Sequence, residues 1–205
     1  MEGAASAHRE LEIEPEPSHW QPRATWAGVR GFTGGAAFFL VSFVFAYFYL
    51  KAQDPNSDWK IGKVQPGIGL GVAILVSLLV SAAALRIAVQ RPESTVRSGG
   101  VALALAFLAA VLQVIQWTTL GFGPASGGYA SVYVGWTIAY TVFVLGCCYW
   151  IETQVATAWR RGRDAAARAQ VSDELVHEGL KACSFFWNFI VFNGLVLFVL
   201  LYALR

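Results

Sequence analysis

Histidine, cysteine and methionine are the side chains with which a helical protein holds haem iron or copper, and this chain has few of them. It contains three histidines, three cysteines and a single methionine, Met1. Cys147 and Cys148 are adjacent, so on a helix they point about 100° apart and cannot clasp one ion from a single face. His8 and His19 lie in an acidic segment, where we expect them to be solvated. The sequence therefore indicates no haem or copper centre within this chain.

Amides, hydroxyls and indoles are the other polar side chains of the apolar stretches. Gln113, Gln116 and Trp117 lie three and four residues apart, so they share one side of a helix. We expect them to make interhelical hydrogen bonds; the alternative is contact with a lipid headgroup or a neighbouring subunit. The full set of candidates for lipid or subunit contact is Gln113, Gln116, Trp117, Ser131, His177, Trp187, Asn188 and Asn193.

His177 lies just before the last apolar stretch and close to Lys181. A histidine at such a helix end can hydrogen-bond locally or act as a proton antenna. We favour the local hydrogen bond.

Five long apolar stretches must position these groups, at about residues 31–50, 67–87, 99–121, 128–151 and 182–204. About 20 apolar residues at 1.5 Å rise each cross a hydrocarbon core of about 30 Å. The chain is 56% hydrophobic and 14% charged, with a mean hydropathy of +0.51, which does not suit a surface that faces only water. No stretch alternates as a barrel strand would. We predict an all-α integral membrane protein whose five transmembrane helices form a bundle.

The basic residues predict the orientation of this bundle. Eleven of the fifteen lie before the first stretch, between the second and third, or between the fourth and fifth. The other four are Lys51, Lys60, Lys63 and Arg205. The excess of Lys and Arg in cytoplasmic segments places the N-terminus in the cytoplasm and the C-terminus outside.

Segments around the spans also carry local signals. Residues 1–27 are rich in glutamate and proline, which predicts a disordered cytoplasmic tail ahead of a five-helix transmembrane domain at residues 28–205. Beyond Glu152 the chain is rich in alanine and charge, so the fourth helix should continue for a few turns. Ser172 is expected to cap the helix that leads into the last span. In the third span, alanines at 102, 106 and 110 predict a face for close helix packing.

Three stretches together resemble subunit III of the haem-copper oxidases, in its five-helix form. The first stretch runs from Phe38-Phe39 through Ala46-Tyr47-Phe48 to Lys51-Ala52. The second contains Gln113, Gln116 and Trp117, followed after a glycine-rich loop by Tyr129-Ala130-Ser131-Val132-Tyr133. The third has His177, Gly179, Leu180, Ala182, Phe186, Trp187 and Phe189 in the family's order.

Polar positions that are usual in that family are replaced here. Ala36 stands where a buried glutamate is usual, and Tyr140 and Phe143 stand where paired histidines are usual. In the last helix Lys181, Asn188 and Val191 stand where glutamate, histidine and aspartate are usual. The resemblance therefore implies the helical scaffold rather than those side chains.

The resemblance implies a non-redox subunit of a terminal oxidase in a prokaryotic plasma membrane. Such a subunit braces catalytic subunit I, together with subunit II, while haem and copper lie in the catalytic partner. The complex passes electrons from cytochrome c or quinol to oxygen. The alternatives are an accessory protein of a nitric oxide reductase, an oxidase assembly factor and a small transporter. A transporter should show a polar midplane or an internal repeat, and we find neither in the sequence.

Overall fold

In the computed structural model, residues 20–54, 59 and 65–204 can be described, and all of their regular secondary structure is helical. The helices are α1 (Trp20–Ala52), α2 (Ile68–Gln90), α3 (Thr95–Thr118), α4 (Gly128–Arg163), α5 (Ala165–Gln170) and α6 (Asp173–Phe198). A short 3-10 turn, η1 (Pro92–Ser94), precedes α3, and a π-helical turn, η2 (Val199–Ala203), ends α6. Within the described ranges five helices are long and apolar enough to cross a membrane, namely all but α5. The predicted all-helical fold with five such helices is confirmed, and it suggests a multi-pass membrane protein.

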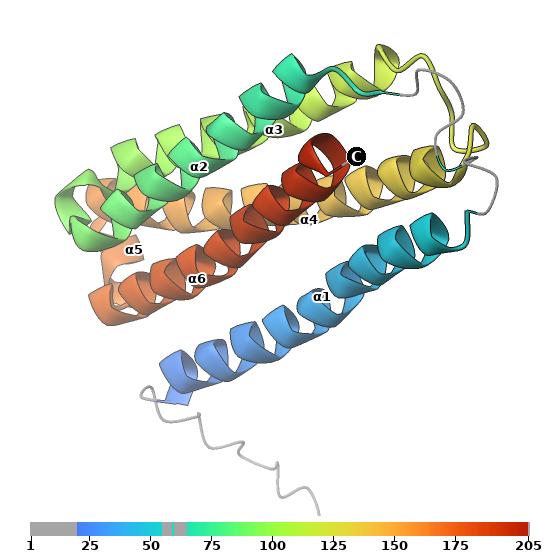
Figure 1. Cartoon of the computed structure of the whole chain (residues 1–205). Coiled ribbons are helices and arrows are strands. Elements are labelled where there is room, and N and C mark those ends of the chain that lie inside the picture. The colour runs from blue at the N-terminus through green and yellow to red at the C-terminus, as the bar shows by residue number, and fades with distance from the viewer. Residues whose placement is uncertain (1–19, 55–58, 60–64, 205) are drawn as a thin grey trace, which may run out of the picture.

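Helix α6 lies in the middle of the bundle, between α1 and the α2–α3 pair, and α4 runs behind it (Figure 1). Its inner face is large and apolar. Trp187, Ile190 and Leu201 of the α6–η2 segment are fully buried. The packing of three neighbours against α6 makes it the central element of the fold.

The α2–α3 pair is held by small residues, as the alanine spacing predicted. Ala102 and Ala106 have no exposed surface, and Ala110 is also buried. The Ser81 hydroxyl of α2 donates a hydrogen bond of 2.7 Å to the carbonyl of Ala102 on α3. Because only small side chains separate the two backbones along this face, the helices approach closely.

Helix α1 lies along one edge of the bundle and packs on α4 and α6 (Figure 1). Near its start the Trp26 indole donates to the Glu178 carboxylate of α6 at 2.8 Å. Near its end the Tyr47 hydroxyl donates to the Leu204 carbonyl at 3.1 Å. Between these bonds the Phe43 ring stacks on Trp136 of α4. The helix is therefore fixed at both ends but buries only its inner face.

The structure extends the first helix well beyond the prediction. The apolar stretch predicted a span from residue 31 and a disordered tail as far as residue 27, whereas α1 begins at Trp20. Residues 1–19 lie outside the described part of the chain. Two causes are visible: Pro22 lies in the first helical turn, where proline is tolerated, and Trp26 gains a partner on α6. Composition could not reveal that distant partner.

The other local predictions agree with the structure. Helix α4 continues past Glu152 and ends at Arg163. The next residue, Asp164, is the N-cap of α5, and its carboxylate accepts the N–H of Ala166 at 2.9 Å. Ser172 caps α6, its hydroxyl accepting the N–H of Leu175 at 3.2 Å. The chain thus turns back from α4 to α6 through the short helix α5, with Asp164 as the N-cap of α5 and Ser172 as the N-cap of α6.

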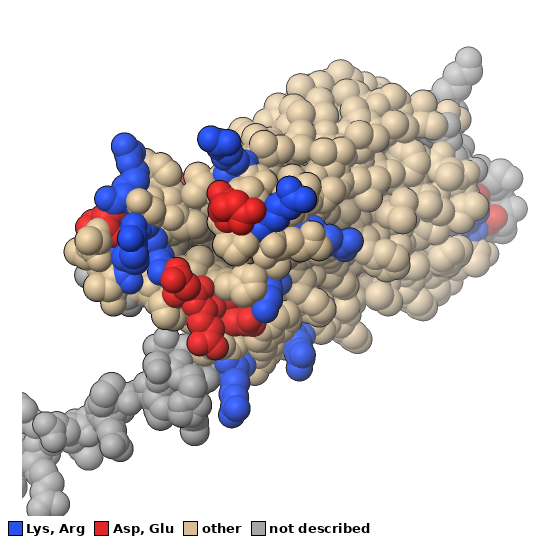
Figure 2. Space-filling model, turned by 90° about the vertical axis from the view of Figure 1, so that its left-hand side faces the viewer, with Lys and Arg blue, Asp and Glu red and all other residues tan. Residues whose placement is uncertain are grey.

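The charged residues gather at one end of the bundle, as Figure 2 shows in a view onto that end. We call it the basic end: it contains the start of α1, the turn between α2 and α3, the end of α4, α5 and the start of α6 (Figure 1). The ion pairs there join Arg161 to Asp173 and Lys181 to Glu178. Charge is thereby kept out of the apolar body.

A substitution of Gly194 tests the close approach of α4 and α6. A Cβ atom at Gly194 would lie 2.3 Å from the Tyr140 hydroxyl oxygen and 3.4 Å from Leu78. We expect Gly194→Ala to lower the free energy of unfolding by about 1–3 kcal/mol, because the buried Tyr140 must shift. Thermal unfolding in detergent measures the change.

Gly146→Ala is the matched control, since Gly146 also lies within a helix but nothing stands within 4 Å of a Cβ there. Alanine at an open helical position should be neutral or stabilising by up to about 1 kcal/mol. Equal unfolding temperatures for the two variants would contradict the packing described here.

Candidate functional site

A chain of buried hydrogen bonds crosses the bundle at the end opposite the basic end. The Gln116 amide of α3 donates to the carbonyl of Gly67 at 3.1 Å, and its oxygen accepts from the Tyr202 hydroxyl of η2 at 2.9 Å. The hydroxyls of Tyr202 and Tyr133 lie 2.9 Å apart. Since the single Tyr202 proton goes to Gln116, Tyr133 is the donor in that pair. The four residues connect α3, α4, η2 and the segment before α2.

Two further tyrosines of α4 bind the backbone of the last helix. The Tyr129 hydroxyl donates to the Leu201 carbonyl at 2.6 Å, and the Tyr140 hydroxyl donates to the Ile190 carbonyl at 3.0 Å. Carbonyls inside a helix normally accept only the helical N–H, but each has a second lone pair. The tyrosines use this capacity, so α4 is joined to the α6–η2 segment by polar as well as apolar contacts.

Gln113 is buried beside this chain of bonds, and its amide nitrogen has no partner among the described residues. It lines a cavity of about 20 Å³ together with Gly71, Tyr140 and Tyr202. Such a volume holds about one water molecule and no larger ligand. This cavity therefore offers room for a bridging water but not for a substrate.

The predicted candidate residues do not meet in one site. Gln113 and Gln116 are interior, and Trp117 donates its indole proton to Thr137 at 3.0 Å. Asn188 and Asn193 bond the carbonyls four residues before them, at 2.7 and 2.9 Å. The remaining three lie apart: Ser131 bonds the loop carbonyls of Pro124 and Gly127, Trp187 is fully buried, and His177 is half-buried at the basic end.

Burial bears on two of these residues. Gln116 and Trp187 have no exposed surface, so in this structure neither can reach lipid or another subunit. Gln116 and Trp117 instead make the interhelical bonds that were the favoured expectation. Their role is to join helices.

Metal-binding groups do not cluster in the described residues. The structure places no three or more His, Cys, Asp or Glu side chains together there. Cys147, Cys148 and Cys183 are free and buried.

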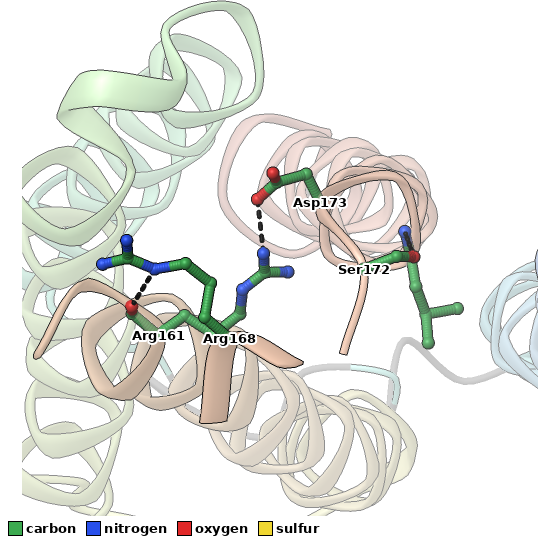
Figure 3. A network of polar contacts seen from close by, with 5 residues as sticks. Arg161, Arg168, Ser172 and Asp173 are labelled. Carbon is green, nitrogen blue, oxygen red and sulfur yellow. Dashed lines mark hydrogen bonds and ion pairs between the residues drawn. The ribbon is translucent and has the colours of Figure 1, made fainter. Parts of the chain in front are cut away.

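Sequence reasoning missed a second polar site, at the basic end. In the sequence, Arg161 is one of the eleven basic residues that predict the orientation, but its side chain is buried and paired with Asp173 (Figure 3). Arg168 of α5 donates its Nε proton to the Arg161 carbonyl at 3.1 Å. The only signal in the sequence was the run of arginines, which does not tell which one turns inward.

Comparison with known proteins adds no family to these observations. No protein-family model matches this chain, and no curated protein matches it by sequence. The interpretation of both polar sites therefore rests on their own geometry.

A double-mutant cycle tests the chain of bonds at Gln116. Gln116→Leu removes the partner of both Gly67 and Tyr202, and we expect it to lower the free energy of unfolding by about 1–3 kcal/mol, since buried polar groups are left unpaired. Tyr202→Phe removes the hydroxyl alone and should cost less. Thermal unfolding of both single variants and the double variant in detergent measures the coupling.

The double variant should be destabilised by less than the sum of the single variants, because the two residues share one bond. Strict additivity would show that this bond contributes nothing to stability.

Proposed function

We propose that this chain is a non-redox integral subunit, similar to subunit III, of a haem-copper terminal oxidase in a prokaryotic plasma membrane. It braces the catalytic subunit, and electron transfer from cytochrome c or quinol to oxygen takes place in that partner. In this proposal the basic end faces the cytoplasm, in keeping with the excess of Lys and Arg on that side.

The outer face of α1 is the observation that carries the proposal. A Cβ atom built on Gly28, Gly31, Gly34 or Gly35 would meet nothing within 4 Å. These glycines leave a shallow open strip along the first half of the helix. Gly31 and Gly35 have the four-residue spacing at which transmembrane helices approach one another closely.

Large aromatic side chains follow this strip on the same face. Phe38 is 85% exposed and Phe45 is 68% exposed. Positions 31, 35, 38, 42, 45 and 49 follow one another every three or four residues, so they form a single stripe. A strip of glycines next to protruding rings suits a partner helix better than lipid alone, since glycine within a helix is otherwise a cost to stability.

The interior supports a bracing role over transport. Several buried polar groups bond to one another or to backbone carbonyls, as at Gln116, Tyr129 and Tyr140. The apolar stretches carry no Asp or Glu at depth. A proton or ion path through the membrane uses such ionisable groups. The proposal therefore assigns electron and proton transfer to a neighbouring subunit.

Isolation of the complex from native membranes tests the proposal. A tagged full-length chain, extracted in mild detergent, is expected to bring with it a subunit with haem and copper, together with oxygen-consuming activity. Mass spectrometry identifies the chains, and an oxygen electrode measures the reaction. A partner that reduces nitric oxide instead would favour the reductase, and absence of the chain from the active complex would favour an assembly factor.

Substitutions on α1 test the face itself. Gly31→Leu and Gly35→Leu fill the open strip, and we expect roughly tenfold less partner to co-purify, because an interface tolerates such overpacking poorly. Gly146→Leu is the control, since it is another open glycine position on a different helix, α4. Full recovery of the partner with both α1 variants would exclude this face as the interface.

The chain purified without partners is expected to carry neither haem nor copper, because its described residues assemble no ligand set for them. An absorption spectrum and elemental analysis measure this. A stoichiometric haem spectrum from the isolated chain would overturn the assignment as a non-redox subunit.

A further inference from the structure

A large open cavity lies at the basic end of the described structure, away from the outer face of α1. It has a volume of about 680 Å³ and is formed where η1, α3, α4, α5 and α6 meet. Thr95, Arg161, Arg168 and His177 contribute polar groups to its lining, and Ala158, Val176 and Leu180 contribute apolar surface. The cavity thus combines cationic donors with an apolar wall.

Arg161 is the most unusual of these residues, because only 8% of its surface is exposed. Its Nη2 atom pairs with Asp173 at 2.5 Å, but its Nη1 atom is buried and has no partner in the described part of the chain. A buried guanidinium group with an unmet donor is costly unless something accepts that hydrogen bond. Since Arg161 lines the cavity, an acceptor bound there would need only a small shift of this side chain to meet the unpaired donor.

Arg168 adds a second guanidinium group from a different element. Its Nε atom donates to the Arg161 carbonyl, which holds the side chain over the end of α4 (Figure 3). Its terminal nitrogens remain for another acceptor. Two guanidinium groups from α4 and α5, next to the half-buried His177 of α6, resemble the arrangement that binds phosphate oxygens.

The acidic residues of the lining do not cancel this preference. Asp173 and Glu174 also line the cavity, but both are exposed, and the Asp173 side chain is fully so, whereas the side chain of Arg161 is only 9% exposed. The carboxylates thus lie toward solvent and the guanidinium group lies deeper. Asp173 moreover forms an ion pair with Arg161. Both acidic residues lie in the first turn of α6, where the positive end of the helix dipole offsets their negative charge.

We propose that this cavity binds an anionic phosphate group, held by Arg161 and Arg168, with His177 as a further donor. The group can belong to an anionic phospholipid or to a soluble phosphate compound, since both offer the same oxygens. The apolar wall from Val176 and Leu180 then contacts the part of the ligand next to the phosphate. This inference is independent of the proposed oxidase partner.

Thermal unfolding of the full chain tests the site, because a ligand that binds only the folded state raises the unfolding temperature. One arm titrates inorganic phosphate into detergent-solubilised protein in a phosphate-free buffer. The other compares nanodiscs of phosphatidylcholine with nanodiscs that also contain phosphatidylglycerol. Stabilisation in the first arm indicates a soluble ligand, and stabilisation in the second alone indicates a headgroup. No stabilisation in either arm would overturn the proposal.

Two arginine variants test whether the stabilisation by phosphate comes from binding in this cavity. Arg168→Gln removes an exposed side chain that should not be needed for folding, and we expect roughly tenfold weaker binding in the arm that responds. Arg97→Gln removes an equal charge from the same end but does not line the cavity, so binding should be unchanged. Equal weakening by both variants would mean that net charge alone, and not this cavity, attracts phosphate.

A third variant, Asp173→Asn, is expected to strengthen phosphate binding rather than weaken it. It removes the carboxylate that competes for Arg161, so it should tighten phosphate binding severalfold even if the unliganded protein is less stable. A purely structural ion pair would give lower stability with no gain in binding, and that result would contradict the role of Arg161 as a phosphate ligand.

Discussion

Every polar group inside an apolar bundle must find its partner within the protein, and this constraint governs the structure. The hydroxyl of Tyr202 meets it by bonding to Gln116, and those of Tyr129 and Tyr140 meet it on carbonyls of the last helix. These bonds cross between helices. These hydroxyl bonds therefore tie the helices together, whereas the side-chain nitrogens of Gln113, Trp136 and Trp187 are buried without a partner in the described part of the chain.

The same constraint explains the end of the last helix. Beyond Phe198 the helix widens into the π-helical turn η2, which changes the direction of its carbonyls. Leu201 and Leu204 there accept hydrogen bonds from the Tyr129 and Tyr47 hydroxyls, on α4 and α1. One irregular turn thus anchors two other helices.

The two ends of the bundle differ in chemistry for this reason. At one end neutral hydroxyls and amides form a closed set of bonds, and at the basic end ionised groups remain in contact with solvent. Arg161 is the exception, since it carries a charge into a buried position with one donor unmet. The exposed glycine strip of α1 is a separate feature, made by missing side chains rather than by unpaired polar atoms. Partner contact and anion binding are thus assigned to different surfaces.

The sequence by itself determined the features that depend on neighbours along the chain. Apolar length predicted five helices, four-residue alanine spacing predicted the α2–α3 face, and Ser172 predicted a cap, because each is a property of a few consecutive turns. Only the tertiary structure decided that Gln116 faces Tyr202, that α1 begins at Trp20, and that Arg161 turns inward. Those outcomes depend on groups far away in the chain, and hydropathy and spacing carry no record of which distant group a side chain will meet.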